Sequence, residues 1–100
     1  MILCKVLGTA VSTRKDAQLQ GAKMLMVVEV DARGEPLAKG TIIVIDAVGA
    51  GRGDVVLVAT GSAANNTPQT AHAPIDATAV AIVDTVSSGG QVLYSVGGSI

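Results

Sequence analysis

TIIVIDAV, GAGRGD, VVLVAT and GSAA follow one another along the chain as residues 41–48, 49–54, 55–60 and 61–64. The first and third segments are rich in β-branched residues and have the length of β-strands. The loop between them has glycine at every second position, and small residues follow the second strand. The stretch therefore predicts two strands joined by a tight glycine-rich connection, with the rest of the chain packed around them.

A glycine-rich loop after a strand is also a feature of phosphate-binding sites, so its spacing matters. A dinucleotide-binding loop has the pattern GxGxxG and opens a helix, whose N-terminus holds the phosphates. Here Asp54 stands at the position of the third glycine, a strand follows, and no Gly-Lys-Ser/Thr sequence closes the loop as in a P-loop. The pattern favours an architectural role, in which glycine lets the backbone adopt positive φ or approach another backbone closely.

Composition indicates one small all-β domain over residues 1–100. Hydrophobic residues make up 49% of the chain and charged residues 15%, and Tyr94 is the only aromatic residue. A chain of this length supports one core, which must be aliphatic, as in a small closed or nearly closed antiparallel barrel. So little charge also implies that another chain covers part of the surface. Alternation and turn residues predict strands at residues 1–11, 23–31, 39–47, 54–60, 79–86 and 91–95, with short helical turns at 61–65 and 74–78.

The charge and hydropathy patterns argue against nucleic acid and membrane partners. The formal net charge is −1, without the clustered Lys and Arg that meet anionic surfaces. The apolar runs are shorter than the ~20 residues of a membrane-spanning helix, and no secretory signal is expected. The one cysteine, Cys4, cannot form an internal disulfide and is predicted to be buried in the first strand, as suits a cytoplasmic protein.

No catalytic, cofactor-binding or metal-binding site is expected. His72, the only histidine, lies in a polar loop, and neither Ser62 nor Cys4 has an evident partner for nucleophilic catalysis. The chain also lacks the Cys and His spacing of metal sites. Aspartates recur near strand ends, where carboxylates commonly accept hydrogen bonds from turn amides, although a paired acid and base or a metal site there stays an alternative. They are Asp46, Asp54, Asp76 and Asp84.

A series of short motifs, in order and spread over nearly the whole chain, resembles the EutN/CcmL family of bacterial microcompartment vertex proteins. Each motif alone is weakly specific, whereas the ordered series at close to the family's spacing is specific. Two positions depart from the family pattern: Asp54 stands where Glu is frequent, and Asn65 stands where a basic residue often follows Ser-Ala-Ala, which argues against an anion-binding role for that turn. The motifs are KVLGTAVSTRK (residues 5–15), LQGAK (19–23), DAVGAGRGDVVLV (46–58), GSAA (61–64), and PIDA (74–77) leading to AIVD (81–84).

The resemblance implies a five-stranded antiparallel barrel of the oligonucleotide-binding (OB) type that assembles into a cyclic homopentamer. Such pentamers close the five-fold vertices of a polyhedral protein shell in the cytoplasm, beside hexameric facet proteins, and no catalysis is implied. A cyclic ring uses different faces of each subunit, and small residues allow two chains to approach closely. We therefore expect the subunit interface or the mouth of a central channel at Gly49, Ala50, Gly51, Gly53, Ser62, Ala63 and Ala64.

An OB-like barrel raises one rival function, the binding of single-stranded nucleic acid. That function stacks bases on aromatic side chains within a basic groove. One tyrosine, with seven basic residues against eight acidic ones, makes a poor platform for it. A small enzyme that uses the aspartates is a more distant alternative. The sequence therefore favours a barrel that serves as a building block.

Overall fold

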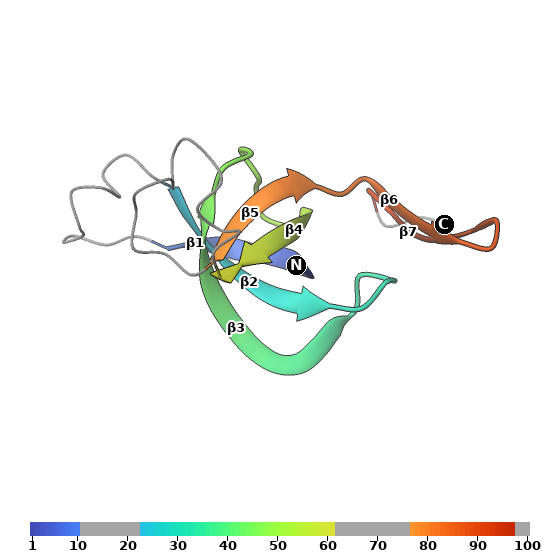
Figure 1. Cartoon of the computed structure of the whole chain (residues 1–100), viewed down its shortest axis with the longest axis horizontal. Helices are drawn as coiled ribbons and strands as arrows, with labels where there is room; N and C mark the ends of the chain where they lie inside the picture. Colours follow the sequence, from blue (N-terminus) through green and yellow to red (C-terminus); the bar gives the residue numbers. More distant parts are fainter. Residues whose placement is uncertain (11–22, 62–76, 98–100) are drawn as a thin grey trace.

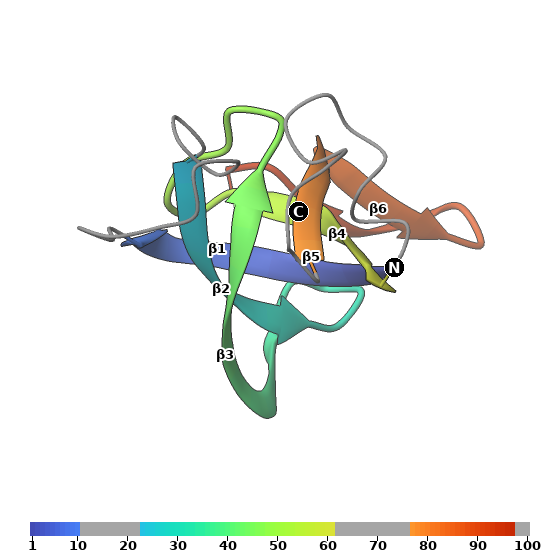
Figure 2. The same cartoon turned by 60° about the vertical axis from the view of Figure 1, so that its left-hand side comes forward.

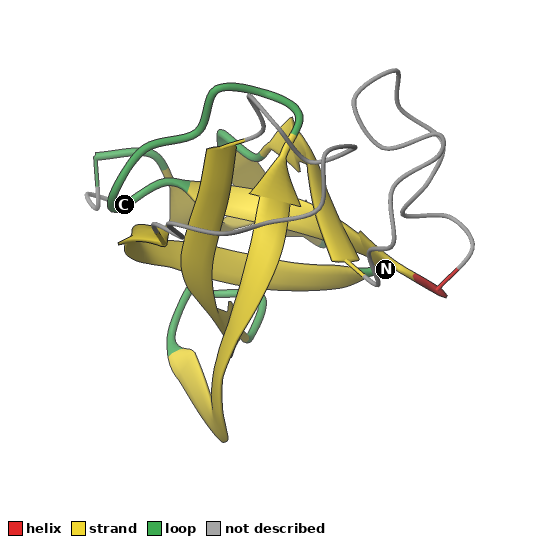
Figure 3. Cartoon of the chain, turned by 90° about the vertical axis from the view of Figure 1, so that its left-hand side faces the viewer, coloured by secondary structure: helices red, strands yellow, loops and turns green. Residues whose placement is uncertain are grey.

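The computed structural model describes residues 1–10, 23–61 and 77–97. The described chain is almost entirely strand and turn (Figure 3). No helix in these residues is long and apolar enough to cross a membrane. The strands are β1 (Ile2–Ala10), β2 (Lys23–Val30), β3 (Pro36–Asp46), β4 (Val55–Thr60), β5 (Ala77–Ile82), β6 (Thr85–Ser88) and β7 (Gln91–Ser95).

Five of these strands close into a barrel in the order β1-β2-β3-β5-β4, with β4 returning to pair with β1 (Figure 1). This arrangement confirms the small five-stranded all-β barrel. The pairs are antiparallel except β3 and β5, which run parallel through Ile45–Thr78 and Asp46–Ala79. The antiparallel pairs from β3 through β2, β1 and β4 to β5 give β5 the same direction as β3. A parallel pair of this kind requires a crossover connection.

The barrel core follows from the two-residue alternation of the strands. On β2, Leu25 and Val27 point inward, and on β3 Val44 does the same, so their side chains meet inside the barrel. Cys4 on β1 belongs to this cluster and is fully buried, which confirms its predicted place in the core. Burial raises the pKa of the Cys4 thiol from 9.0 to about 11, and the nearby Glu29 carboxylate adds to the rise.

The end of the chain differs from the prediction of one strand over residues 79–86. The structure divides this segment, with β5 ending at Ile82 and β6 beginning at Thr85. At the break, the amide of Val83 donates to the carbonyl of Val55 on β4, at 2.8 Å. The strands β6 and β7 then form a separate two-stranded sheet, the β6–β7 hairpin, which leaves the barrel as an arm (Figures 1 and 2).

The two predicted helical turns fall largely outside the described residues. Of the first turn, at 61–65, only Gly61 is described. Of the second, at 74–78, the residues Ala77 and Thr78 belong to β5, so a helical turn does not extend over them.

Candidate functional site

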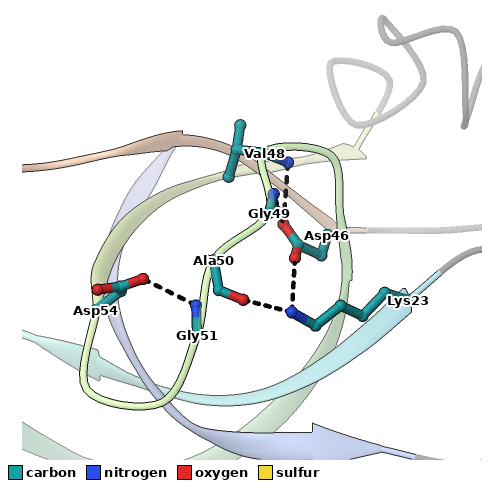
Figure 4. A network of polar contacts seen from close by, with 7 residues as sticks. All are labelled: Lys23, Asp46, Val48, Gly49, Ala50, Gly51 and Asp54. Atoms are coloured by element: carbon teal, nitrogen blue, oxygen red, sulfur yellow. Dashed lines mark hydrogen bonds and ion pairs between the residues drawn. The ribbon is translucent and has the colours of Figure 1, made fainter.

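The loop between β3 and β4 (residues 47–54) is held by the aspartate that ends β3. The Asp46 carboxylate accepts hydrogen bonds from the amides of Val48 and Gly49, with Oδ1 at 2.9 and 3.0 Å (Figure 4). An Asp side chain that bonds amides two and three residues ahead stabilises a turn directly after a strand. The first half of the loop is therefore folded back over the end of its own strand.

The second oxygen of Asp46 joins the loop to β2. Its Oδ2 lies 3.4 Å from Nζ of Lys23, and the Asp46 side chain is only 1% exposed. This oxygen is buried and accepts no hydrogen bond from the residues that the structure describes, so the ammonium of Lys23 supplies its compensating charge. The same Nζ donates to the carbonyl of Ala50 at 2.6 Å (Figure 4). One lysine thus ties β2, the end of β3 and the middle of the loop together.

The second half of the loop is fixed by Asp54 and by β1. The Asp54 carboxylate accepts from the amide of Gly51 at 2.8 Å, and the Asp54 amide donates back to the carbonyl of Gly51 at 3.0 Å. The amide of Gly53 donates to the carbonyl of Val6, and the amide of Val6 donates to the carbonyl of Asp54, both at 2.9 Å. The loop shape is therefore determined within one subunit.

Two of the three glycines of the loop are required by the conformation of the backbone. Gly49 and Gly53 have φ of 74° and 90°, where other residues are strained, whereas Gly51 does not have positive φ. In the described part of the chain, a Cβ at Gly49 or Gly53 would meet no atom within 4 Å, and one at Gly51 would approach only Asp54 Oδ2, at 3.9 Å. Backbone conformation, and not close packing within the subunit, explains Gly49 and Gly53.

The remaining small residues proposed from the sequence lie in different places. The Ala50 side chain is fully buried and belongs to the core of its own barrel. Gly49 and Gly53 are exposed, and Gly51 is half-buried. Ser62, Ala63 and Ala64 lie outside the described residues.

The loop does not have the chemistry of a phosphate cradle. Such a cradle needs backbone amides that point at the ligand. Here the amides of Val48, Gly49 and Gly51 already donate to the loop's own aspartates, and that of Gly53 donates to β1. Asp46 and Asp54 act as acceptors for turn amides, which agrees with the structural use predicted for the aspartates.

Other candidate chemistry in the described residues is limited. No group of three or more His, Cys, Asp or Glu side chains in this part of the chain is placed to hold a metal ion. His72 and Asp76 lie outside the described residues. The Asp84 carbonyl accepts from the amide of Val96, at 2.8 Å, where the β6–β7 hairpin begins and ends.

Tyr94 occupies a place that the sequence did not indicate. Its ring lies over the turn between β2 and β3, where a Cβ added to Gly34 would stand 2.9 Å from the ring. It also packs against the small apolar cluster at this end of the barrel. The one aromatic ring is thus engaged within the subunit and does not form an open platform for bases. Beside it is a cavity of about 260 Å³ lined by Lys5, Arg33, Gly34, Glu35, Leu93, Tyr94 and Ser95.

Comparison with known proteins gives matches over nearly the whole chain. The family described as "Ethanolamine utilisation protein EutN/carboxysome" matches residues 1–84. The carboxysome shell vertex protein CcmL of Synechocystis sp. is 45% identical over 95 residues, which are 95% of this chain and 94% of CcmL. The microcompartment shell vertex protein GrpN of Rhodospirillum rubrum is 44% identical over 88 residues, 88% of this chain and 98% of GrpN.

Solved structures agree with these relatives in fold. A carboxysome CcmL subunit superposes with a TM-score of 0.88 at 45% identity and covers 96% of this chain and 99% of its own. The GrpN pentameric microcompartment shell protein of Rhodospirillum rubrum has a TM-score of 0.76 at 43% identity, covering 88% of this chain and 99% of its own. With its barrel, its glycine loop and these full-length matches, the chain belongs to the EutN/CcmL family.

Proposed function

We propose that this chain is a structural protein of a bacterial microcompartment shell, where it forms cyclic pentamers at the five-fold vertices. The observation that carries the proposal is the match to vertex proteins over almost the full length of both chains. One of these relatives is a pentameric shell protein in its solved structure. The shell lies in the cytoplasm, and the chain acts there as a building block.

The mechanism is geometric. A flat sheet of hexagonal tiles closes into a polyhedron only when five-fold units occupy its corners, and a pentamer of this chain supplies them. Its neighbours in the shell are then hexameric facet proteins. The role requires no bound cofactor and no catalytic residue, because contacts between subunits are sufficient to form and hold the pentamer.

Within the pentamer, we assign the loop between β3 and β4 to the contact between subunits or to the mouth of the central channel. Its fixed shape presents Gly49, Gly51 and Gly53 without side chains, so a second chain can approach the backbone closely. Ala50 serves the same loop by anchoring it from inside the barrel. The remaining members of this proposed site are Ser62, Ala63 and Ala64.

Native mass spectrometry tests the pentamer, and electron microscopy tests its place in the shell. The wild-type chain is expected as a pentamer, and electron microscopy of the pentamer mixed with hexameric shell proteins is expected to show closed shells. A strict monomer that binds oligonucleotide tightly would instead favour the nucleic-acid function.

Gly51 is the position of choice for testing the loop, because it lacks positive φ and has space for a side chain. We expect Gly51→Trp to weaken the pentamer, whereas Gly51→Ala, the matched control, keeps it. A Gly51→Trp chain that still forms an intact pentamer would remove the loop from the subunit contact.

A further inference from the structure

The β6–β7 hairpin is a well-formed structure that has little support from its own barrel. Gly89 and Gly90, with φ of 57° and 79°, occupy a two-residue turn in which both central residues have positive φ, as tight hairpins prefer. In the described part of the chain, β6 and β7 form a sheet of their own. A hairpin of two strands is marginally stable in water unless something packs against it.

The root of the hairpin is fixed to the barrel, so the arm has a defined orientation relative to the barrel. The amide of Val96 donates to the carbonyl of Asp84, which closes the base of the hairpin. Tyr94 packs over Gly34 and against the apolar cluster that contains Val55. The arm therefore projects in one direction from the barrel, as Figures 1 and 2 both show.

The hairpin exposes apolar side chains beyond the part that rests on its own barrel. Tyr94 pairs with Val86 and packs on the barrel, whereas Val92 pairs with Ser87, and the bulge between these two pairs turns Val92 to the opposite face. Val92 and Val96 are 42% and 55% exposed. An apolar surface on a projecting arm indicates a contact with another chain.

The hairpin also lacks the features that normally protect free strand edges. Exposed edges usually carry charges or proline, which prevent pairing with other strands. Residues 85–95 contain no charged residue and no proline. Both outer edges of the hairpin are thus unprotected, as suits strands that are covered in the working assembly.

A second unprotected surface lies on β3. The edge of β3 pairs with β5 only from Ile45 onward, so no described strand pairs with this edge before that residue. Ile42 and Ile43 are 38% and 53% exposed here. Lys39 is engaged by Glu29, with Nζ and Oε2 3.5 Å apart, and residues 40–45 carry no charge. This stretch of β3 and the arm are both uncharged, and both expose apolar side chains.

We propose that the hairpin of one subunit docks on residues 40–44 of β3 in the next subunit of the ring, with Val92 against Ile42 and Ile43. The inference rests on the pentamer proposed above. A cyclic ring requires two different surfaces on each subunit, and the arm and the bend of β3 point away from the barrel in different directions (Figures 1 and 2).

Disulfide cross-linking tests the contact directly. The double variant Ile43→Cys with Val92→Cys, oxidised at assembly concentration, is expected to give a ladder of covalent oligomers up to the pentamer on a non-reducing gel. Each single variant serves as control and is expected to give no ladder. The native Cys4 is buried and does not interfere.

Charge insertion gives an independent readout. Because Val92→Lys places an unpaired ammonium in the contact, we expect it to raise the concentration needed for pentamer formation by about tenfold or more. Leu7→Lys, at an exposed apolar residue of β1 outside both surfaces, is the matched control and is expected to keep the pentamer. Circular dichroism of each variant checks that the barrel is folded.

The outcomes separate the two proposals. A wild-type pentamer without the cross-linked ladder, together with an intact Val92→Lys pentamer, would overturn the docking contact and leave the vertex function standing. The docking contact is equally overturned if Val92→Lys keeps the pentamer and loses only assembly with hexameric shell proteins. A wild-type chain that is monomeric would count against the proposed function itself.

Discussion

The glycine loop (residues 47–54) and the β6–β7 hairpin are both turns rich in glycine, yet they differ in where their bonding groups are satisfied. Two aspartates, a lysine and the backbone of β1 hold the loop within its own subunit. Among the described residues, the hairpin is attached to the barrel at its root and exposes apolar side chains beyond it. The loop therefore keeps its shape without a partner, whereas the hairpin is expected to depend on one.

This difference separates two kinds of variant. Changes that remove hydrogen bonds of the loop or strain its backbone are expected to alter the stability of the subunit, because these interactions lie inside one chain. Changes along the arm are expected to alter assembly, because they touch side chains that one chain leaves exposed. The predictions below test that division, from the largest expected effect to the smallest.

Asp46→Ala is expected to destabilise the subunit most. It removes two hydrogen bonds to loop amides and leaves the ammonium of Lys23 without its carboxylate. The expected loss is about 3 kcal/mol in the free energy of unfolding, measured by urea denaturation. Asp46→Asn, which keeps an acceptor oxygen for the turn, is expected to lose less. Equal losses for the two variants would show that the turn bonds contribute nothing.

Gly34→Ala is expected to loosen the root of the hairpin. The substituted residue would have to keep a φ of 82°, and its new Cβ would stand 2.9 Å from the Tyr94 ring. Together these effects are expected to cost about 2 kcal/mol. Because Tyr94 is the only aromatic residue, its fluorescence reports the displacement of the ring.

Gly40→Ala is the matched control for that variant. Gly40 has φ of 77° and open space around its Cβ position, so it isolates the cost of the backbone conformation. The difference between the two variants measures the contact with Tyr94. If Gly40→Ala and Gly34→Ala lose the same stability and leave the fluorescence unchanged, the ring does not anchor the arm.

Gly53→Ala and Gly51→Ala sharpen the account of the loop. Gly53 has φ of 90° and is expected to cost about 1 kcal/mol when replaced. Gly51 does not have positive φ, and its replacement is expected to change stability by less than about 0.5 kcal/mol. Thermal denaturation of the two variants side by side measures the difference, and a larger loss at Gly51 would contradict the structural explanation.

The last expected effect is absent at neutral pH and is a dependence of stability on alkaline pH through Cys4. Burial raises the pKa of this thiol from 9.0 to about 11, so the folded state favours the neutral form. Its contribution to stability is complete below pH 9 and is lost as the pH rises towards 11. Comparing the pH slopes of wild type and Cys4→Ala between pH 8 and 11 checks this, and identical slopes would refute it.

Local patterns in the sequence were sufficient for most of the strands and for the small barrel, although β3 begins at Pro36 and not at residue 39. Residues 91–95 were predicted as a strand with the bounds that β7 has, and Cys4 was placed in the core because alternation assigns faces. Alternation does not assign strand partners, so the parallel pairing of β3 with β5 could not be predicted. The resemblance to the family supplied the oligomer, which one chain's periodicity does not contain.

The parts that could not be predicted depend on contacts distant in the sequence. The break after Ile82 forms where Val83 reaches back to Val55, and Asp84, of a type common in turns, is the one local feature that accompanies it. The contact of Tyr94 with Gly34 joins residues sixty positions apart. The conformational need for glycine was foreseen, and it holds at Gly49 and Gly53. The ties of Lys23 to the loop have no sequence signature, because a lone lysine at a strand start is usually solvated.

The mass of the native assembly tests the central claim most directly. Native mass spectrometry of the purified chain is predicted to show a complex of five chains of 9.9 kDa each. A chain that stays at 9.9 kDa at every concentration up to that used for shell assembly would contradict the account.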